Sequence, residues 1–165
     1  LKMALGYELT VTDSKGTEIK LTSMDGQHGG REDIICASYK SNTLNDDSIA
    51  RSNDVRAEIK IIGRITAENK DTTCELANWS KEKDSSLIYR KVKLTTYPSP
   101  SNPTLLRNYE LENMFVLDYT ESFDMPTENM PENVKSNISS ENDNGLFELY
   151  LVQKNGAYSQ YIESK

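Results

Sequence analysis

The sequence predicts a mainly β fold, a small antiparallel β-barrel of about eight short strands with one short α-helix. Three observations predict it. Apolar and polar residues alternate in several short segments, turn-forming residues separate these segments, and a single segment has a helical period. So many antiparallel strands favour a closed or nearly closed barrel, or a sandwich, because open strand edges invite aggregation.

The N-terminal segments predict a hairpin followed by a third strand. Tyr7, Leu9 and Val11 alternate with polar residues, a turn occupies residues 13–16, and residues 19–22 read as the return strand. Residues 26–31 form a glycine-rich loop, and residues 34–39 are β-branched and aromatic enough for a strand. The polar stretch 40–54 predicts a long loop.

The clearest strand covers residues 55–65. Its odd-numbered positions up to Ile61 are apolar and its even-numbered positions up to Lys60 are charged, which is typical of a sheet with one solvated face. Ile62 interrupts the polar side, so we expect that end of the strand to be covered on both faces.

One segment changes to a helical period. Asp71 or Thr72 can cap a helix, Glu75 lies at capping-box spacing from Thr72, and Leu76 and Trp79 share a face. This pattern predicts a helix over residues 73–83, with Trp79 as the anchor that seats it on the sheet.

The second half of the chain predicts further strands over residues 88–97, 108–119 and 146–152, with an edge strand over 158–162. The run 114–117 is apolar on both sides and is expected to pass through the core. Residues 121–145 carry six acids and one base with two prolines, which indicates a mobile acidic loop. We therefore expect one domain, residues 1–165, with this loop as an insertion.

Composition excludes some partners. The chain has 165 residues with 26 acidic and 19 basic side chains, a net charge of −7, which argues against nucleic acid as a partner. No apolar run is long enough to span a membrane, and the first residues lack the apolar core of a signal peptide. We expect a cytoplasmic protein at synthesis, with two reduced thiols.

The sequence offers little catalytic chemistry. His28 is the single histidine, and Cys36 and Cys74 read as two small core residues. No nucleophile elbow, zinc motif or phosphate loop occurs. The oxygen-rich stretches at 45–47 and 141–145 lack the ligand spacing of a tight calcium loop, so solvated turns are favoured. We expect no catalytic residue, no cofactor and no metal, and hence no enzyme.

Three stretches resemble one family. The stretch YELENMFV at 109–116 resembles the Y-x-L-E-N-A/M-x-V strand of Hcp-like tube proteins, the ring-forming subunits of type VI secretion tubes that are related to phage tail tubes. The stretch YRKVKLTTY at 89–97 resembles the strand before it. The stretch NDDSIARSNDV at 45–55 is similar to a clostridial set labelled "membrane-associated protease 1", although no residue here supports a protease.

The resemblance implies a structural role. Hcp-like subunits are small β-barrels with one helix that assemble head to tail into rings of six, and the rings stack into a hollow tube. Loop 40–54 is then the candidate for subunit contact, with basic residues meeting acids of the next copy. The candidate contact residues are Asp46, Asp47, Arg51, Asp54 and Arg56. A solvated loop stays open as an alternative, and so does a monomeric or weakly associating barrel that binds a protein or small ligand through its tyrosines and loop acids.

Overall fold

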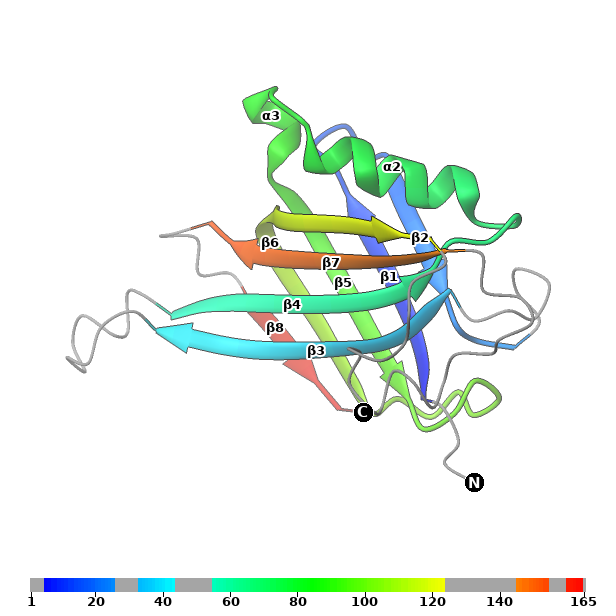
Figure 1. Ribbon diagram of the computed structural model, residues 1–165. Helices are drawn as coiled ribbons and strands as arrows, with labels where there is room; N and C mark the ends of the chain where they lie inside the picture. Colours follow the sequence, from blue (N-terminus) through cyan, green and yellow to red (C-terminus); the bar gives the residue numbers. More distant parts are fainter. Residues whose placement is uncertain (1–4, 26–32, 44–54, 124–144, 155–159, 165) are drawn as a thin grey trace.

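The structure is a computed structural model that describes residues 5–25, 33–43, 55–123, 145–154 and 160–164. Within these ranges the chain forms eight strands and two helices (Figure 1). The strands are β1 (Gly6–Thr12), β2 (Glu18–Thr22), β3 (Ile34–Thr43), β4 (Val55–Arg64), β5 (Arg90–Tyr97), β6 (Arg107–Ser122), β7 (Leu146–Gln153) and β8 (Gln160–Glu163). The helices are α2 (Lys70–Ser80) and α3 (Ser85–Ile88).

All the strands belong to one antiparallel sheet, in the order β2-β1-β5-β6-β7-β4-β3, with β8 pairing β6. The mainly β prediction is therefore confirmed. Strand β6 has 16 residues; its first half pairs β5 and β8, and its second half pairs β7.

The sheet bends in the middle of β6. Asn113 has a φ of 56°, a left-handed conformation that asparagine tolerates better than most residues, and the register against β5 shifts at this level. The bend divides the sheet into a first half-sheet (β2, β1, β5, the start of β6, and β8) and a second half-sheet (the end of β6, β7, β4 and β3). Figure 1 shows the strands of the two half-sheets crossing at a steep angle.

The predicted closed barrel is wrong, because the sheet remains open between β2 and β3. Closure needs a ladder between these strands, but β2 has only five residues. The two segments meet at one corner alone, where the Asp33 amide donates to the Thr22 carbonyl at 3.2 Å and the Ile34 amide donates to Ser23 Oγ at 3.0 Å. Elsewhere side chains bridge the half-sheets; for example, the rings of Tyr39 and Tyr109 stack at 4.5 Å.

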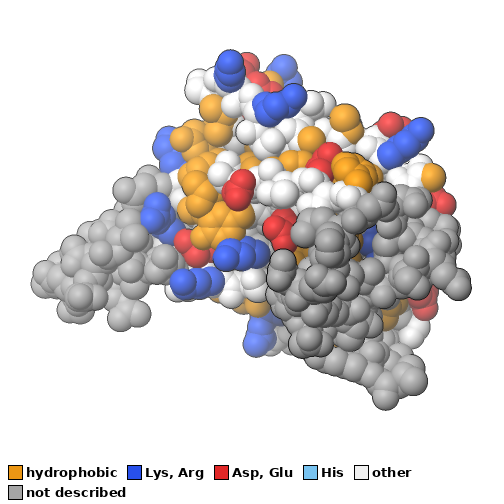
Figure 2. All heavy atoms as spheres, in the orientation of Figure 1, with side chains coloured by type: hydrophobic (Ala, Val, Ile, Leu, Met, Phe, Trp, Pro, Cys, Tyr) orange, Lys and Arg blue, Asp and Glu red, His pale blue; other side chains and the backbone are white. Residues whose placement is uncertain are grey.

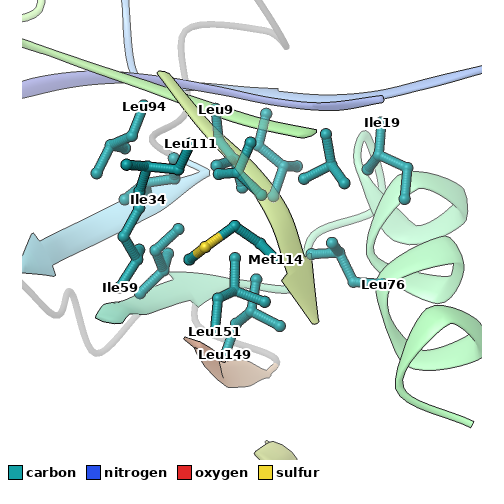
Figure 3. Close-up of a cluster of buried hydrophobic side chains, with 14 of the residues drawn as sticks. Leu9, Ile19, Ile34, Ile59, Leu76, Leu94, Leu111, Met114, Leu149 and Leu151 are labelled. Carbon is teal, nitrogen blue, oxygen red and sulfur yellow. The ribbon is translucent and has the colours of Figure 1, made fainter. Parts of the chain in front are cut away.

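The core lies between the two half-sheets and beneath α2. Figure 3 shows its side chains pointing toward one another. They come from the first half-sheet (Leu9, Ile19, Leu94, Leu111), from the second (Ile34, Ile59, Leu149, Leu151), from the bend (Met114) and from the helix (Leu76), and all are at most 3% exposed. The apolar positions of each alternating segment therefore point inward as the sequence predicts.

A buried polar network fixes the corner where the sheet comes nearest to closing. Asp33 and Asn69 are both fully buried. The Asp33 carboxylate accepts from the Thr22 amide at 3.0 Å and from Asn69 Nδ2 at 2.8 Å. Asn69 Oδ1 in turn accepts from the Thr66 amide at 2.8 Å. The network ties the end of β2 and the start of β3 to the segment that enters α2.

Helix α2 begins at Lys70, earlier than the predicted start at residue 73, and ends at Ser80. The predicted capping by Asp71 or Thr72 is wrong, because the N-cap residue is Asn69, whose side chain is held in the network just described. The anchor prediction is confirmed: Trp79 is 3% exposed, and its Nε1 donates to the Ile88 carbonyl at 2.8 Å.

Several other predicted boundaries change. Helix α3 occupies residues 85–88, so the strand predicted from residue 88 begins at Arg90. The predicted loop 40–54 overlaps β3, which continues to Thr43, and the predicted acidic loop 121–145 overlaps β6, which ends at Ser122. Residues 44–54 and 124–144 lie outside the described residues.

Candidate interaction surfaces

Of the three residues with catalytic potential, the structure describes the two cysteines. His28 lies outside the described residues. The cysteines were expected in the core, but Cys74 is exposed on α2 and Cys36 is half-buried on β3. Burial raises the pKa of the Cys36 thiol, which keeps it in its protonated, less nucleophilic form. In the part of the chain with described coordinates, no three His, Cys, Asp or Glu side chains cluster as a metal site, and no helix is long and apolar enough to cross a membrane.

Of the five candidate contact residues, the structure places one. Arg56 lies on β4, opposite Asn42 of β3, with its side chain half-buried. Asp46, Asp47, Arg51 and Asp54 lie outside the described residues. The pairing of Arg56 with an acid of another subunit therefore stays a prediction.

Three of the described strands have an edge that pairs no other described strand. β3 pairs β4 alone, β2 pairs β1 alone and β8 pairs β6 alone. β3 has ten residues, twice the length of β2, and β8 has four. An edge strand presents a row of backbone donors and acceptors that a strand of another chain can satisfy. The open sheet thus offers the long edge of β3 and the shorter edges of β2 and β8, where a closed barrel would offer none.

The outer faces of the two half-sheets differ. On the first half-sheet the outward residues of β1, β2 and β5 are polar or charged, for example Thr10, Lys20 and Lys93. On the second half-sheet, apolar residues lie among the charges: Ile35 and Leu146 form a second buried cluster against which Cys36 and Ile62 pack. Ile62 itself is half-buried, so the outer face near it is covered in part.

A groove of about 580 Å³ lies on the outer face of the second half-sheet, across β4, β7 and β6. Its outward lining residues are Lys60, Ile62, Leu117, Asp118, Thr120, Glu148 and Tyr150. Figure 2 views this face and shows hydrophobic side chains gathered over β6 and β7, with acidic and basic side chains around them.

Leu117 enters the groove because β6 is irregular there. The register of β6 against β7 shifts between Val116 and Asp118, so one extra residue sits in β6. Such a bulge re-aims side chains, and Leu117 is 57% exposed. The prediction that the whole run 114–117 passes through the core is therefore wrong: Met114 is buried, but Leu117 faces solvent.

The charged side chains of the groove differ in whether they contact another described side chain. The Lys60 ammonium lies 4.8 Å from the centre of the Tyr150 ring, a cation–π contact. Desolvation, followed by the hydrogen bond to Glu58, raises the pKa of the Tyr150 hydroxyl, which therefore stays neutral. Asp118 and Glu148, by contrast, form neither a hydrogen bond nor an ion pair with another described residue.

Sequence reasoning missed this groove. Its signals were present but separate: Ile62 on a polar side, and an apolar run on both faces at 114–117. The residues are brought together by the strand register, which places Lys60 beside Tyr150 and Tyr150 beside Asp118 on three adjacent strands.

Comparison with solved structures gives the class of fold. The chain matches a mutant of Hcp1 from the E. coli EAEC 042 pathovar with a TM-score of 0.52 and 13% identity, covering 96% of this chain and 98% of the other. Hcp1 from Flavobacterium johnsoniae matches with a TM-score of 0.49 and 16% identity, covering 96% of each chain. The sheath-tube complex of an extracellular contractile injection system, PVC, matches with a TM-score of 0.47 and 15% identity, covering 96% of this chain and 88% of the other.

This chain therefore has an Hcp-like fold, as the sequence resemblance implies; the E. coli Hcp1 match carries that statement, and it concerns the fold alone. No protein-family profile matches the sequence, and no curated protein matches it. None of these comparisons tests the "membrane-associated protease 1" label.

Proposed function

We propose that the chain is a non-enzymatic structural subunit resembling the tube protein of a phage-tail-like or type VI-like contractile injection apparatus, and that it self-assembles into rings. The observation that carries the proposal is the Hcp-like fold over nearly the whole chain. Its partners are then other copies of itself and other subunits of the apparatus. It is made in the cytoplasm and exported as part of the assembled apparatus.

The shape of the sheet supports self-association. A ring needs a heterologous contact, in which two different surfaces of one subunit meet and the rotation closes. The long edge of β3 and the short edge of β2 are two such surfaces at opposite ends of the strand order. Pairing between them would satisfy the edge groups of both strands without any catalytic residue.

Reversing the charge of Arg56 tests the proposed contact between subunits. It lies on β4, the neighbour of the edge strand, and we expect it to meet Asp46 or Asp47 of the next subunit. Arg56→Glu then places like charges together and weakens assembly. The triple variant Arg56→Glu, Asp46→Arg, Asp47→Arg restores opposite charges and restores assembly.

The experiment is negative-stain electron microscopy of the wild type, R56E and the triple variant, with mass measured by light scattering. The matched control is Arg107→Glu, because Arg107 is an exposed arginine on the first half-sheet. Rings are expected for the wild type, the triple variant and R107E, and fewer rings for R56E. A wild type without rings at any concentration would contradict ring assembly; rings unaffected by R56E would contradict the Arg56 contact.

The groove favours a second candidate function, a monomeric or weakly associating module that binds a protein or small ligand. The same microscopy separates the two, since this candidate predicts particles of one subunit. An occupant bound by a chain that never forms rings would support the second candidate.

A further inference from the structure

The groove on the second half-sheet has the chemistry of a peptide-binding surface. Its floor has apolar surface from Ile62 and the Tyr150 ring, and the exposed Leu117 lines it on β6. Covering an exposed leucine lowers the free energy, because apolar surface is then removed from water. Side chains of this kind in an open groove fit a ligand with an apolar stripe.

The free charges of the groove are acidic. Lys60 is engaged over the Tyr150 ring, whereas the carboxylates of Asp118 and Glu148 have no partner among the described residues. A ligand that supplies cations there forms charge-assisted hydrogen bonds, and an acidic ligand is repelled. The two carboxylates therefore favour a basic ligand over an acidic one, a choice that the apolar floor alone does not make.

We propose that this groove binds an amphipathic basic segment of another protein, with aliphatic side chains on its floor and Lys or Arg side chains on Asp118 and Glu148. This inference goes beyond the proposed tube function and does not depend on it, since the groove belongs to a single subunit. It occupies a sheet face, whereas ring assembly was assigned to strand edges.

The register sets the spacing that the ligand must meet. Asp118 lies opposite Tyr150, and Glu148 lies opposite Thr120, so the two carboxylates are diagonal neighbours on adjacent strands. Diagonal neighbours on paired strands are about 7–8 Å apart. Alternate positions of an extended peptide share one face and are about 7 Å apart, so two basic residues can reach both acids while apolar residues at flanking positions of the same face cover the floor.

A second copy of this chain is the less favoured occupant. Each copy carries a net charge of −7, so a second copy brings further negative charge toward two unpaired carboxylates. A basic segment neutralises them instead. The two occupants make opposite predictions for the effect of neutralising the two acids. Neutralisation should weaken the binding of a basic peptide and strengthen the association with a second copy.

The test is fluorescence anisotropy with a labelled peptide in which two lysines and the leucines that flank them occupy alternate positions, with serines between them, titrated with the full chain at low and at high salt. The comparison peptide has glutamate in place of lysine. The groove variants are Leu117→Ser and the pair Asp118→Asn with Glu148→Gln. The matched control is the pair Glu18→Gln with Glu110→Gln, which removes two acids from the first half-sheet. Circular dichroism checks that each variant is folded.

Saturable binding of the lysine peptide, at least tenfold tighter than that of the glutamate peptide, is expected. The acid pair and L117S should each weaken it at least tenfold, the control pair should not, and salt should weaken binding to the wild type more than to the acid pair. Equal losses in the control pair and the groove pair would overturn the proposal in favour of attraction by overall charge. Self-association that increases in the acid pair, without peptide binding, would overturn it in favour of a second copy. Peptide binding by a single subunit supports this inference whether or not the microscopy shows rings, so the two proposals can fail separately.

Discussion

The helix depends on one side chain, and replacing Trp79 by alanine should cost much of the stability of the domain. Trp79 is 3% exposed and packs in the core with Leu76. A tryptophan buries on the order of 200 Å². At about 25 cal/mol per Å² this corresponds to about 5 kcal/mol, of which alanine keeps a part. The expected loss is therefore about 3–5 kcal/mol, in the range of other buried aromatic truncations.

Trp79→Phe separates packing from hydrogen bonding. Phenylalanine keeps most of the apolar contact but cannot donate to the Ile88 carbonyl, which the indole reaches at 2.8 Å. Losing one such bond should cost about 1–2 kcal/mol. Leu117→Ala is the control, because Leu117 is 57% exposed and its truncation should change the free energy of unfolding by less than ~0.5 kcal/mol.

The assay is urea unfolding followed by far-ultraviolet circular dichroism, because the chain contains a single tryptophan and both variants lose its fluorescence. A loss below ~1 kcal/mol in W79A would refute the packing argument, since a buried aromatic truncation costs more than that. Equal losses in W79F and W79A would attribute the effect to the hydrogen bond.

Three further predictions follow from the buried polar groups and close contacts. Asp33→Asn should lower the free energy of unfolding by about 2–3 kcal/mol. Asparagine has one acceptor oxygen, so its NH2 group must face either the Thr22 amide or Asn69 Nδ2, which both donate to the carboxylate. An unchanged urea midpoint would contradict this. Gly63→Ala should cost about 1–3 kcal/mol, because a Cβ there meets the Asp33 carbonyl, whereas a midpoint equal to that of the wild type would show that the strand can move. Desolvation and the hydrogen bond to Glu8 raise the pKa of Tyr97 from 10.0 to about 12. The stability that this shift supplies is complete below about pH 10 and is lost as the pH rises toward 12. Ultraviolet titration of the wild type and of Tyr97→Phe should differ by one tyrosine ionisation with a pKa near 12. A difference at a pKa near 10 would contradict the hydrogen bond to Glu8.

Much of the fold follows from local patterns in the sequence. The alternation in β1, and in β4 up to Ile61, is strict enough to fix which residues face the core, and Leu76 with Trp79 fixes the buried face of the helix. These patterns depend on side chains a few residues apart, so local sequence carries them.

What the sequence could not supply depends on contacts between distant segments. Asn69, the N-cap residue of the helix, is held by a hydrogen bond to Asp33, which is 36 residues away. The sheet stays open because β6 bends at Asn113 and β2 is too short to form a ladder with β3. The position of Leu117 depends on a register shift against β7. The groove depends on this register shift and on the pairing of β4 and β6 with β7, so no local motif predicts it.

Ring assembly is the central claim, and the mass of the native particle tests it most directly. Native mass spectrometry of the wild-type chain over a wide range of concentration should show a closed species of about six times the 18.7 kDa subunit, in line with the rings of six implied by the family resemblance. The same species should decrease in R56E and persist in R107E. A single-subunit mass at every concentration would contradict the account.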